Sequence, residues 1–248
     1  RVAVGYSLAG AMHTIYMRSD QPPFNDNRVR RAVKLTLDRN ALLQAVRLGV
    51  GEVSNDNPLP SGNPWFTDTG MMERDIDEAK RLLEEAGYAD GLTEDLFVPG
   101  GNDGLLDLAV GIQGMARPAG FQFNIVVIPS DVFWGQNWLK ENFGVDSWSM
   151  RGTADEQIRI AYYCGAAWNE SHTCLPEMDA ALDKAAESTD PAERKAHYAK
   201  VQQIFSDEGG SAIPYHFSKV GAYTTALKGY KVHPMGLWDD PRAIWLDR

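Results

Sequence analysis

The sequence predicts an α/β fold in which helices flank a mixed β-sheet. The first observation is a strand at Leu96–Val98, followed by a glycine-rich loop at Pro99–Gly104 and an amphipathic helix at Leu105–Met115. The second is Phe121–Val127, where apolar and polar residues alternate as in a half-buried strand. Together these segments make a strand–helix–strand unit, which crosses over right-handed and pairs its two strands in parallel.

The N-terminal residues predict one strand and two helices. The apolar stretch His13–Met17 is typical of a strand. Asn25 or Asp26 can cap a helix whose apolar residues recur at helical spacing. Asp38 can cap a second helix, which Gly49 ends by taking the left-handed conformation. We therefore expect the strand to lead directly into a helical pair.

The next segment combines a long loop with one strongly marked helix. Gly51–Gly70 is dense in Pro, Gly, Asn, Asp and Ser, which predicts an irregular excursion. Asp75 and Glu78 then form a capping pattern at the start of a helix, and Gly87 can end it. The apolar residues of this helix form one stripe, so we expect its role to be packing.

After the strand–helix–strand unit, the signals become weaker. Ser130 can cap a helix that continues to about Lys140. Val145–Met150 is expected to be a further strand, followed by a long loop that reaches Leu175. This loop is the longest predicted segment without regular structure in the second half of the chain.

The last third predicts two helices and a strand. Pro176–Ser188 has helical apolar spacing. Asp190 is followed by a proline and, two residues later, by a glutamate, which marks a helix start, and that helix is expected to end near Asp207. Alternation over Ile213–Phe217 predicts a final strand.

Composition and motifs exclude several classes of function. The 248 residues carry a net charge of −10, which disfavours nucleic-acid binding because phosphate recognition needs a clustered basic surface. No apolar run reaches the length of a membrane-spanning helix. The sequence has no nucleophile elbow, zincin motif, P-loop or dinucleotide fingerprint, and its five histidines show no ligand spacing. It therefore predicts no metal, no cofactor and no enzymatic activity.

Three blocks, in order, resemble one protein family. They are PPFNDNRVRRAVKLTLDR at Pro22–Arg39, GEVSNDNPLPSGNP at Gly51–Pro64 and DEAKRLLEEAGY at Asp77–Tyr88. These blocks resemble the extracytoplasmic solute-binding proteins of the ABC importers for peptides and nickel. The helices and strand of the last third are similar to the ending of the same family, so the resemblance covers nearly the whole chain.

The resemblance implies a C-terminal lobe of a two-lobed periplasmic binding protein. Residues 15–221 are expected to form this lobe, with residues 1–14 and 222–248 crossing the hinge and including a remnant of the other lobe. The chain is thus expected to be a C-terminal half, with the N-terminal lobe and an export signal on a missing part. The implied function is capture of a small solute, peptide-like or anionic and opine-like, for delivery to a membrane permease. A ligand-presenting partner of a chemoreceptor and a hydrolase of small acidic substrates are the alternatives.

The two cysteines of the chain, Cys164 and Cys174, are separated by residues that favour turns. A loop of that length can bring their Cα atoms within disulfide reach, and an even count suits an oxidising compartment. Two free thiols are the alternative. A zinc site with His172 would lack a fourth ligand and the usual cysteine spacing.

The long loop after Trp148 carries the candidate ligand-binding residues. In the peptide-binding relatives, the matching loop has a tryptophan followed by an aspartate that holds the ligand's α-ammonium group. Trp148 matches that tryptophan, but Arg151 stands at the position of the aspartate. Arginine offers only donors and a positive charge, so this position favours an anionic ligand. The candidate residues are Trp148, Ser149, Arg151, Asp155 and Asn169, with Tyr163 and Trp168 as weaker ones.

Each of these residues also has a structural interpretation. Trp148 could be a core residue, and Arg151 could form an ion pair with Asp155. Asn169 could stabilise a turn. The loop at Pro99–Gly104 could bind an anion at a helix N-terminus, or it could be a turn that requires glycine.

Overall fold

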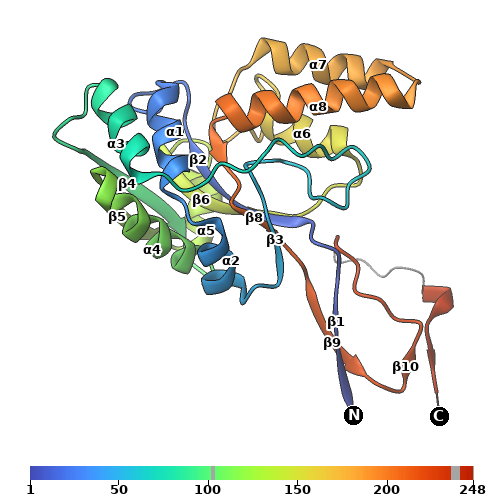
Figure 1. Cartoon of the computed structure of the whole chain (residues 1–248). Helices are drawn as coiled ribbons and strands as arrows, with labels where there is room; N and C mark the ends of the chain where they lie inside the picture. The colour runs from blue at the N-terminus through green and yellow to red at the C-terminus, as the bar shows by residue number, and fades with distance from the viewer. Residues whose placement is uncertain (102–103, 236–240, 248) are drawn as a thin grey trace.

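A computed structural model of the chain describes residues 1–101, 104–235 and 241–247 (Figure 1). Its centre is a mixed sheet with the strand order β3-β8-β2-β6-β4-β5, and β7 pairs with β2 beside β8. The strands are β2 (Ala11–Met17), β3 (Gly51–Val53), β4 (Leu92–Pro99), β5 (Phe121–Ile128), β6 (Phe143–Trp148), β7 (Ser211–Ala212) and β8 (Tyr215–Phe217). β4 pairs in parallel with β5 and β6, whereas β2 runs antiparallel to β6. The predicted mixed sheet with a parallel strand–helix–strand unit is confirmed.

Helices cover both faces of this sheet (Figure 1). The helices form two groups. The first group packs its apolar residues against the face of the sheet that carries Ile15 and Val145. The second group packs against the other face, which carries Met12 and Trp148. The first group is α1 (Asn27–Thr36), α2 (Arg39–Arg47), α3 (Ile76–Glu85) and α4 (Leu105–Ala116). The second group is α6 (Ala154–Tyr162), α7 (Pro176–Glu187) and α8 (Pro191–Glu208).

Four of the predicted helix starts are confirmed by capping hydrogen bonds. Asp26 accepts from the backbone N–H of the second residue of α1, and Asp38 and Asp75 accept from the N–H of the third residue of α2 and α3. Asp190 accepts from two backbone N–H groups at the start of α8. Each cap satisfies donors that have no partner within the helix, so these boundaries are set by local chemistry.

Two predictions for the second half are wrong. The helix expected from Ser130 to about Lys140 is a single turn, α5 (Ser130–Val132), which continues as the π-helical segment η2 (Phe133–Asn137). The segment expected to be loop as far as Leu175 contains α6. Thr153 caps α6 by accepting from the N–H of Glu156, and a stripe of buried residues fixes the helix against α7 and the sheet.

Smaller differences concern the strands. β6 begins and ends two residues earlier than the predicted strand at Val145–Met150. Of the predicted strand Ile213–Phe217, only Tyr215–Phe217 forms a strand, β8. Ile213 and Pro214 separate β8 from β7, and proline cannot donate to a ladder. The irregular excursion at Gly51–Gly70 starts with the short strand β3.

The two ends of the chain form ribbons outside the main sheet (Figure 1). β1 (Val2–Tyr6) pairs antiparallel with β9 (Val220–Thr224), and β10 (Leu227–Lys228) pairs with β11 (Trp245–Leu246). The strand β2 already lies in the main sheet from Ala11, four residues before the expected lobe boundary at residue 15. The short helices η1 (Arg117–Ala119) and η3 (Pro241–Ala243) complete the described elements. No helix within the described ranges is long and apolar enough to cross a bilayer.

Candidate ligand-binding site

The carboxyl ends of three parallel strands meet at one edge of the sheet. β4 ends at Pro99, β5 at Ile128 and β6 at Trp148, and their parallel pairing places these ends together. Open α/β sheets bind ligands at this edge, in the loops that follow the strands. The segments that follow here are the start of α4, the pair α5–η2, and the loop at residues 149–153. Residues 102–103 of the predicted anion-binding loop lie outside the described part of the chain.

Four tryptophans gather at this edge. The ring centroid of Trp138 lies 5.6 Å from that of Trp134, 6.5 Å from Trp148 and 6.1 Å from Trp168. Trp148 and Trp168 are 6.2 Å apart. Trp148 is 4% exposed, whereas Trp134 and Trp168 are 42% and 41% exposed. We call these four residues the tryptophan cluster.

Arg151 lies against the tryptophan cluster. Its guanidinium carbon is 5.7 Å from the ring centroid of Trp148 and 5.4 Å from that of Trp168, which is cation–π range. Its backbone N–H donates to Gln157, which fixes the loop to α6. Its side-chain Nε is buried and has no hydrogen-bond partner among the described residues. Arg151 is therefore a positive charge with unused donors beside an aromatic surface.

The structure does not form the ion pair between Arg151 and Asp155 that was the structural alternative for Arg151. Asp155 lies in the first turn of α6 and accepts from Arg159, one helical turn later, at 3.1 Å and 3.2 Å. Arg159 also pairs with Asp183 of α7 at 2.9 Å. Helix geometry places Asp155 beside Arg159 rather than beside Arg151. Ser149 follows Trp148 directly and is exposed.

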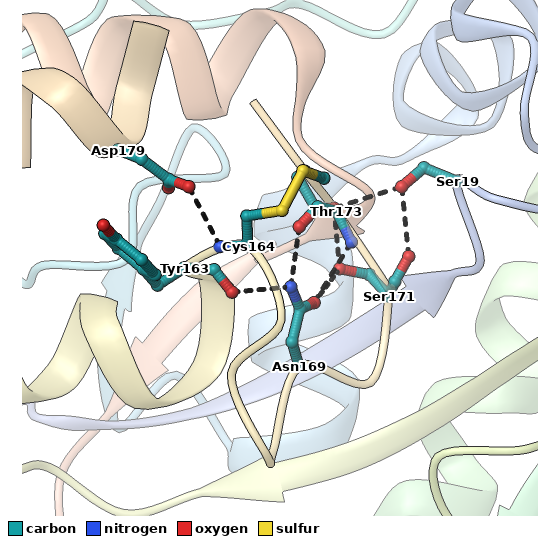
Figure 2. The surroundings of a disulfide bond; sticks show 8 residues. Ser19, Tyr163, Cys164, Asn169, Ser171, Thr173 and Asp179 are labelled. Atoms are coloured by element: carbon teal, nitrogen blue, oxygen red, sulfur yellow. Dashed lines mark hydrogen bonds between the residues drawn. A yellow bond between two sulfur atoms is a disulfide. The ribbon is translucent and has the colours of Figure 1, made fainter. Parts of the chain in front are cut away.

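Asn169 is buried, and the loop itself uses its hydrogen-bonding groups (Figure 2). Its Nδ2 donates to the carbonyl oxygens of Tyr163 and Thr173 at 3.1 Å and 2.7 Å. Its Oδ1 accepts from the Ser171 hydroxyl and the Thr173 N–H, both at 3.1 Å. The structure thus gives Asn169 the turn-stabilising role, and it fixes the loop that carries Trp168.

The same loop is closed by a disulfide between Cys164 and Cys174, whose Cα atoms are 4.4 Å apart (Figure 2). The backbone N–H of Cys164 donates to Asp179 of α7 at 3.1 Å. His172, the residue considered as a zinc ligand together with these cysteines, contacts the Leu139 carbonyl oxygen. Within the described residues, no group of three or more His, Cys, Asp or Glu could hold a metal ion.

Two buried carboxyl groups lie under the tryptophan cluster. Glu170 accepts from the indole Nε1 of Trp138 at 3.0 Å and of Trp148 at 3.2 Å. The Thr14 hydroxyl of β2 lies 2.6 Å from an oxygen of Asp146 and 3.0 Å from an oxygen of Glu170. Burial, together with the neighbouring Glu170, raises the pKa of Asp146 well above its ordinary value. A protonated Asp146 can donate to Glu170, so the pair is held without two adjacent negative charges.

The sequence analysis missed this group of residues. Trp134 and Trp138 were not considered, because they lie in a segment expected to be an ordinary helix. An acidic residue within the apolar strand FGVDSW was the available signal for Asp146. Glu170 carried no local signal, since its partners come from β2, from β6 and from Trp138, which follows η2.

The chemistry of this edge is recognition. The carboxyl pair is fully buried beneath the rings, so it cannot reach a solute. The accessible groups beside the tryptophan cluster include the ring faces of Trp134 and Trp168 and the Ser149 hydroxyl. A cavity of about 640 Å³ lies at the opposite edge, near Gly91 and Phe121, away from these groups.

The chain is thus an α/β protein with an aromatic surface and one adjacent arginine at the carboxyl edge of its sheet. Residues 3–170 match the family described as bacterial extracellular solute-binding proteins, family 5 middle. The chain belongs to this family, as its sequence blocks predict.

Curated relatives match most of the chain but less than half of their own length. The dipeptide-binding protein of Escherichia coli (strain K12) is 26% identical over 229 residues, which cover 86% of this chain and 42% of the relative. The oligopeptide-binding protein AppA of Bacillus subtilis (strain 168) is 24% identical, with 85% and 42% covered.

Solved structures share the fold. The dipeptide-binding protein from Pseudoalteromonas sp. SM9913, in complex with Met-Leu, has a TM-score of 0.83 at 23% identity and covers 96% of this chain and 48% of its own. The binding protein MoaA of Agrobacterium tumefaciens R10, in complex with mannopinic acid, has a TM-score of 0.84 at 21% identity, with 100% and 52% covered.

Proposed function

We propose that this chain is part of the substrate-binding component of an ABC importer. It captures a small solute between its own sheet edge and a second lobe, and it presents that solute to the permease. Family membership supports the proposal, as do relatives named for dipeptide and oligopeptide binding. The relatives are about twice as long as the match, which fits a second lobe. We place the protein outside the cytoplasm, in the periplasm.

The observation that carries the proposal is Arg151. Among the described residues, no carboxylate pairs with the Arg151 guanidinium, which lies beside the exposed ring of Trp168 and so remains available to another molecule. Arginine binds carboxylates through two parallel hydrogen bonds. The ligand proposed for this site is therefore anionic, with Ser149 and the exposed ring of Trp168, rather than the buried Trp148, lining the place where it binds.

We further propose that residues 15–221 form one lobe and that residues 1–14 and 222–248 cross to the other. The β1–β9 ribbon leaves the main sheet, and its side chains Val2 and Tyr6 are 74% and 59% exposed. Apolar residues in such a ribbon are normally covered. Packing against a second lobe accounts for them.

The mechanism is closure of two lobes about these crossing segments. A ligand favours the closed form only through contacts that the open form lacks. Arg151 is suited to this role, because a carboxylate bound at an open edge stays hydrated, whereas closure removes water and strengthens the charge interaction. The proposed function consists of binding and delivery, without a chemical step on the solute.

Native mass spectrometry of the purified protein in its two-lobed form tests the proposal. The expected spectrum contains a bound small molecule that is released on unfolding. An Arg151→Gln variant should lose this molecule, while Arg31→Gln, an exposed arginine on α1, should keep it. Equal occupancy in Arg151→Gln contradicts the role of Arg151, and the absence of any solute-binding activity in ligand screens contradicts the function.

A further inference from the structure

We infer that the ligand of this site carries a flat aromatic ring in addition to a carboxylate. The ring stacks on the exposed faces of the tryptophan cluster while Arg151 binds the carboxylate. This inference rests on the proposed function and specifies the class of solute, an aromatic carboxylate.

The exposed rings are the first argument. Trp134 and Trp168 both contact Trp138, and each leaves about two-fifths of its surface in contact with solvent. The chain has seven tryptophans, and four of them meet at this one edge. Rings that remain exposed within a packed aromatic cluster offer a stacking surface, and offset or edge-to-face contacts with a ligand ring add to the area that is buried.

The unused donors are the second argument. The indole Nε1 of Trp134 donates to Ser130 at 3.1 Å, and those of Trp138 and Trp148 donate to Glu170. Within the described residues, the indole N–H of Trp168 has no such partner. The Arg151 guanidinium lies 5.4 Å from the centre of this same ring. An acceptor with two oxygens can use both groups, which is the geometry that a carboxylate provides.

The third argument is that the surface is fixed before binding. Glu170 holds two of the rings from below, through hydrogen bonds to their Nε1 groups. The disulfide-closed loop and Asn169 hold the backbone around Trp168. The π-helical turn η2 carries Trp134 and leads directly into Trp138, and such turns are frequent at functional sites. A rigid aromatic surface loses little entropy on binding a rigid ring.

The carboxyl groups near the rings do not occupy the Arg151 guanidinium. Glu170 is fully buried, and three neighbouring side chains share its oxygens. Asp155 is engaged by Arg159 rather than by Arg151. Among the described residues, no carboxylate forms an ion pair with the Arg151 guanidinium.

Three small probes separate the ring from the charge. Indole-3-acetate has both features, tryptamine has the same ring with a positive charge, and acetate has the charge without the ring. Titration of the ¹⁵N-labelled chain, followed through the indole N–H signals, reports binding even when it is weak. We expect indole-3-acetate to bind at least about 10-fold more tightly than either other probe and to shift the Trp168 signal.

Matched variants locate the binding. Arg151→Gln and Trp168→Leu should each weaken indole-3-acetate binding by about 10-fold or more. The controls are Arg31→Gln and Trp245→Leu, which alter an exposed arginine and an exposed tryptophan elsewhere and should change the affinity less than about 2-fold. Both site variants change partly exposed side chains, and unchanged far-UV circular dichroism verifies the fold.

The outcomes distinguish this inference from the proposed function. Equal affinity for indole-3-acetate and acetate, with both lost in Arg151→Gln, overturns the aromatic part and leaves an anion-binding site. If the aliphatic dipeptide Gly-Leu binds and Trp168→Leu does not change its affinity, the aromatic part of the inference is likewise overturned. If none of these probes shifts any signal, the inference is refuted, and only the ligand screen of the two-lobed protein then decides the broader function.

Discussion

Removal of the buried carboxylate of Glu170 should destabilise the protein and disorder the tryptophan cluster. Glu170 accepts from two indole N–H groups, and its oxygen is also 3.0 Å from the Thr14 hydroxyl. Glu170→Ala leaves both indole donors without an acceptor in a place where water is excluded. A hydrogen bond to a charged group contributes about 1.5–3 kcal/mol, so the two indole bonds together account for about 3–6 kcal/mol.

The expected loss is large relative to the usual stability of a domain, about 5–15 kcal/mol. Urea denaturation at pH 7 measures the free energy of unfolding, and near-ultraviolet circular dichroism reports the order of the tryptophans. Glu170→Gln keeps one acceptor oxygen and should lose about half as much. If the alanine variant does not fold, the glutamine variant still provides the measurement.

Glu156→Ala is the control, because this glutamate lies exposed at the start of α6. Its effect should stay within about 0.5 kcal/mol. A loss below about 1 kcal/mol for Glu170→Ala, with an unchanged near-ultraviolet spectrum, would refute the view that this carboxylate organises the cluster.

Three further predictions concern buried charge and the disulfide. Burial lowers the pKa of Lys34 to about 8, so the unfolded state binds more protons between pH 8 and 10.5, and the stability of the protein rises with pH over this range. Lys34→Met should therefore stabilise the protein by about 1–3 kcal/mol at pH 7 and by less at pH 10, as measured by urea denaturation. The raised pKa of Asp146 contributes stability that is complete below pH 3.8 and is lost as pH rises. The variant Asp146→Asn can still donate to Glu170, so its free energy of unfolding relative to the wild type should increase from pH 4 to pH 7. Reduction of the Cys164–Cys174 disulfide should cost about 2–3 kcal/mol from loop-closure entropy, and dithiothreitol should have no effect on a variant with serine at both positions. A pH-independent difference in either titration experiment, or an unchanged thermal midpoint after reduction, contradicts the respective argument.

The sequence alone determined the elements whose causes are local. Asp26, Asp38, Asp75 and Asp190 each cap a helix through backbone N–H groups two or three residues ahead. The strand–helix–strand unit is likewise contained in one continuous segment, and its parallel pairing follows from the handedness of the crossover. The family blocks also depend only on the order of residues, so membership could be predicted without coordinates.

Only the tertiary structure decided what the candidate site is made of. Glu170, Asp146 and Thr14 come from a loop and two strands, and no spacing rule connects them. An ion pair with Asp155 was the structural alternative for Arg151. The helix α6, which the sequence analysis missed, instead pairs Asp155 with Arg159, and Arg151 lies against the tryptophans. Capping and periodicity depend on residues that are close in the sequence. A site at a sheet edge is assembled by strand register and by loops that are far apart in the sequence, so its composition is a property of the folded chain.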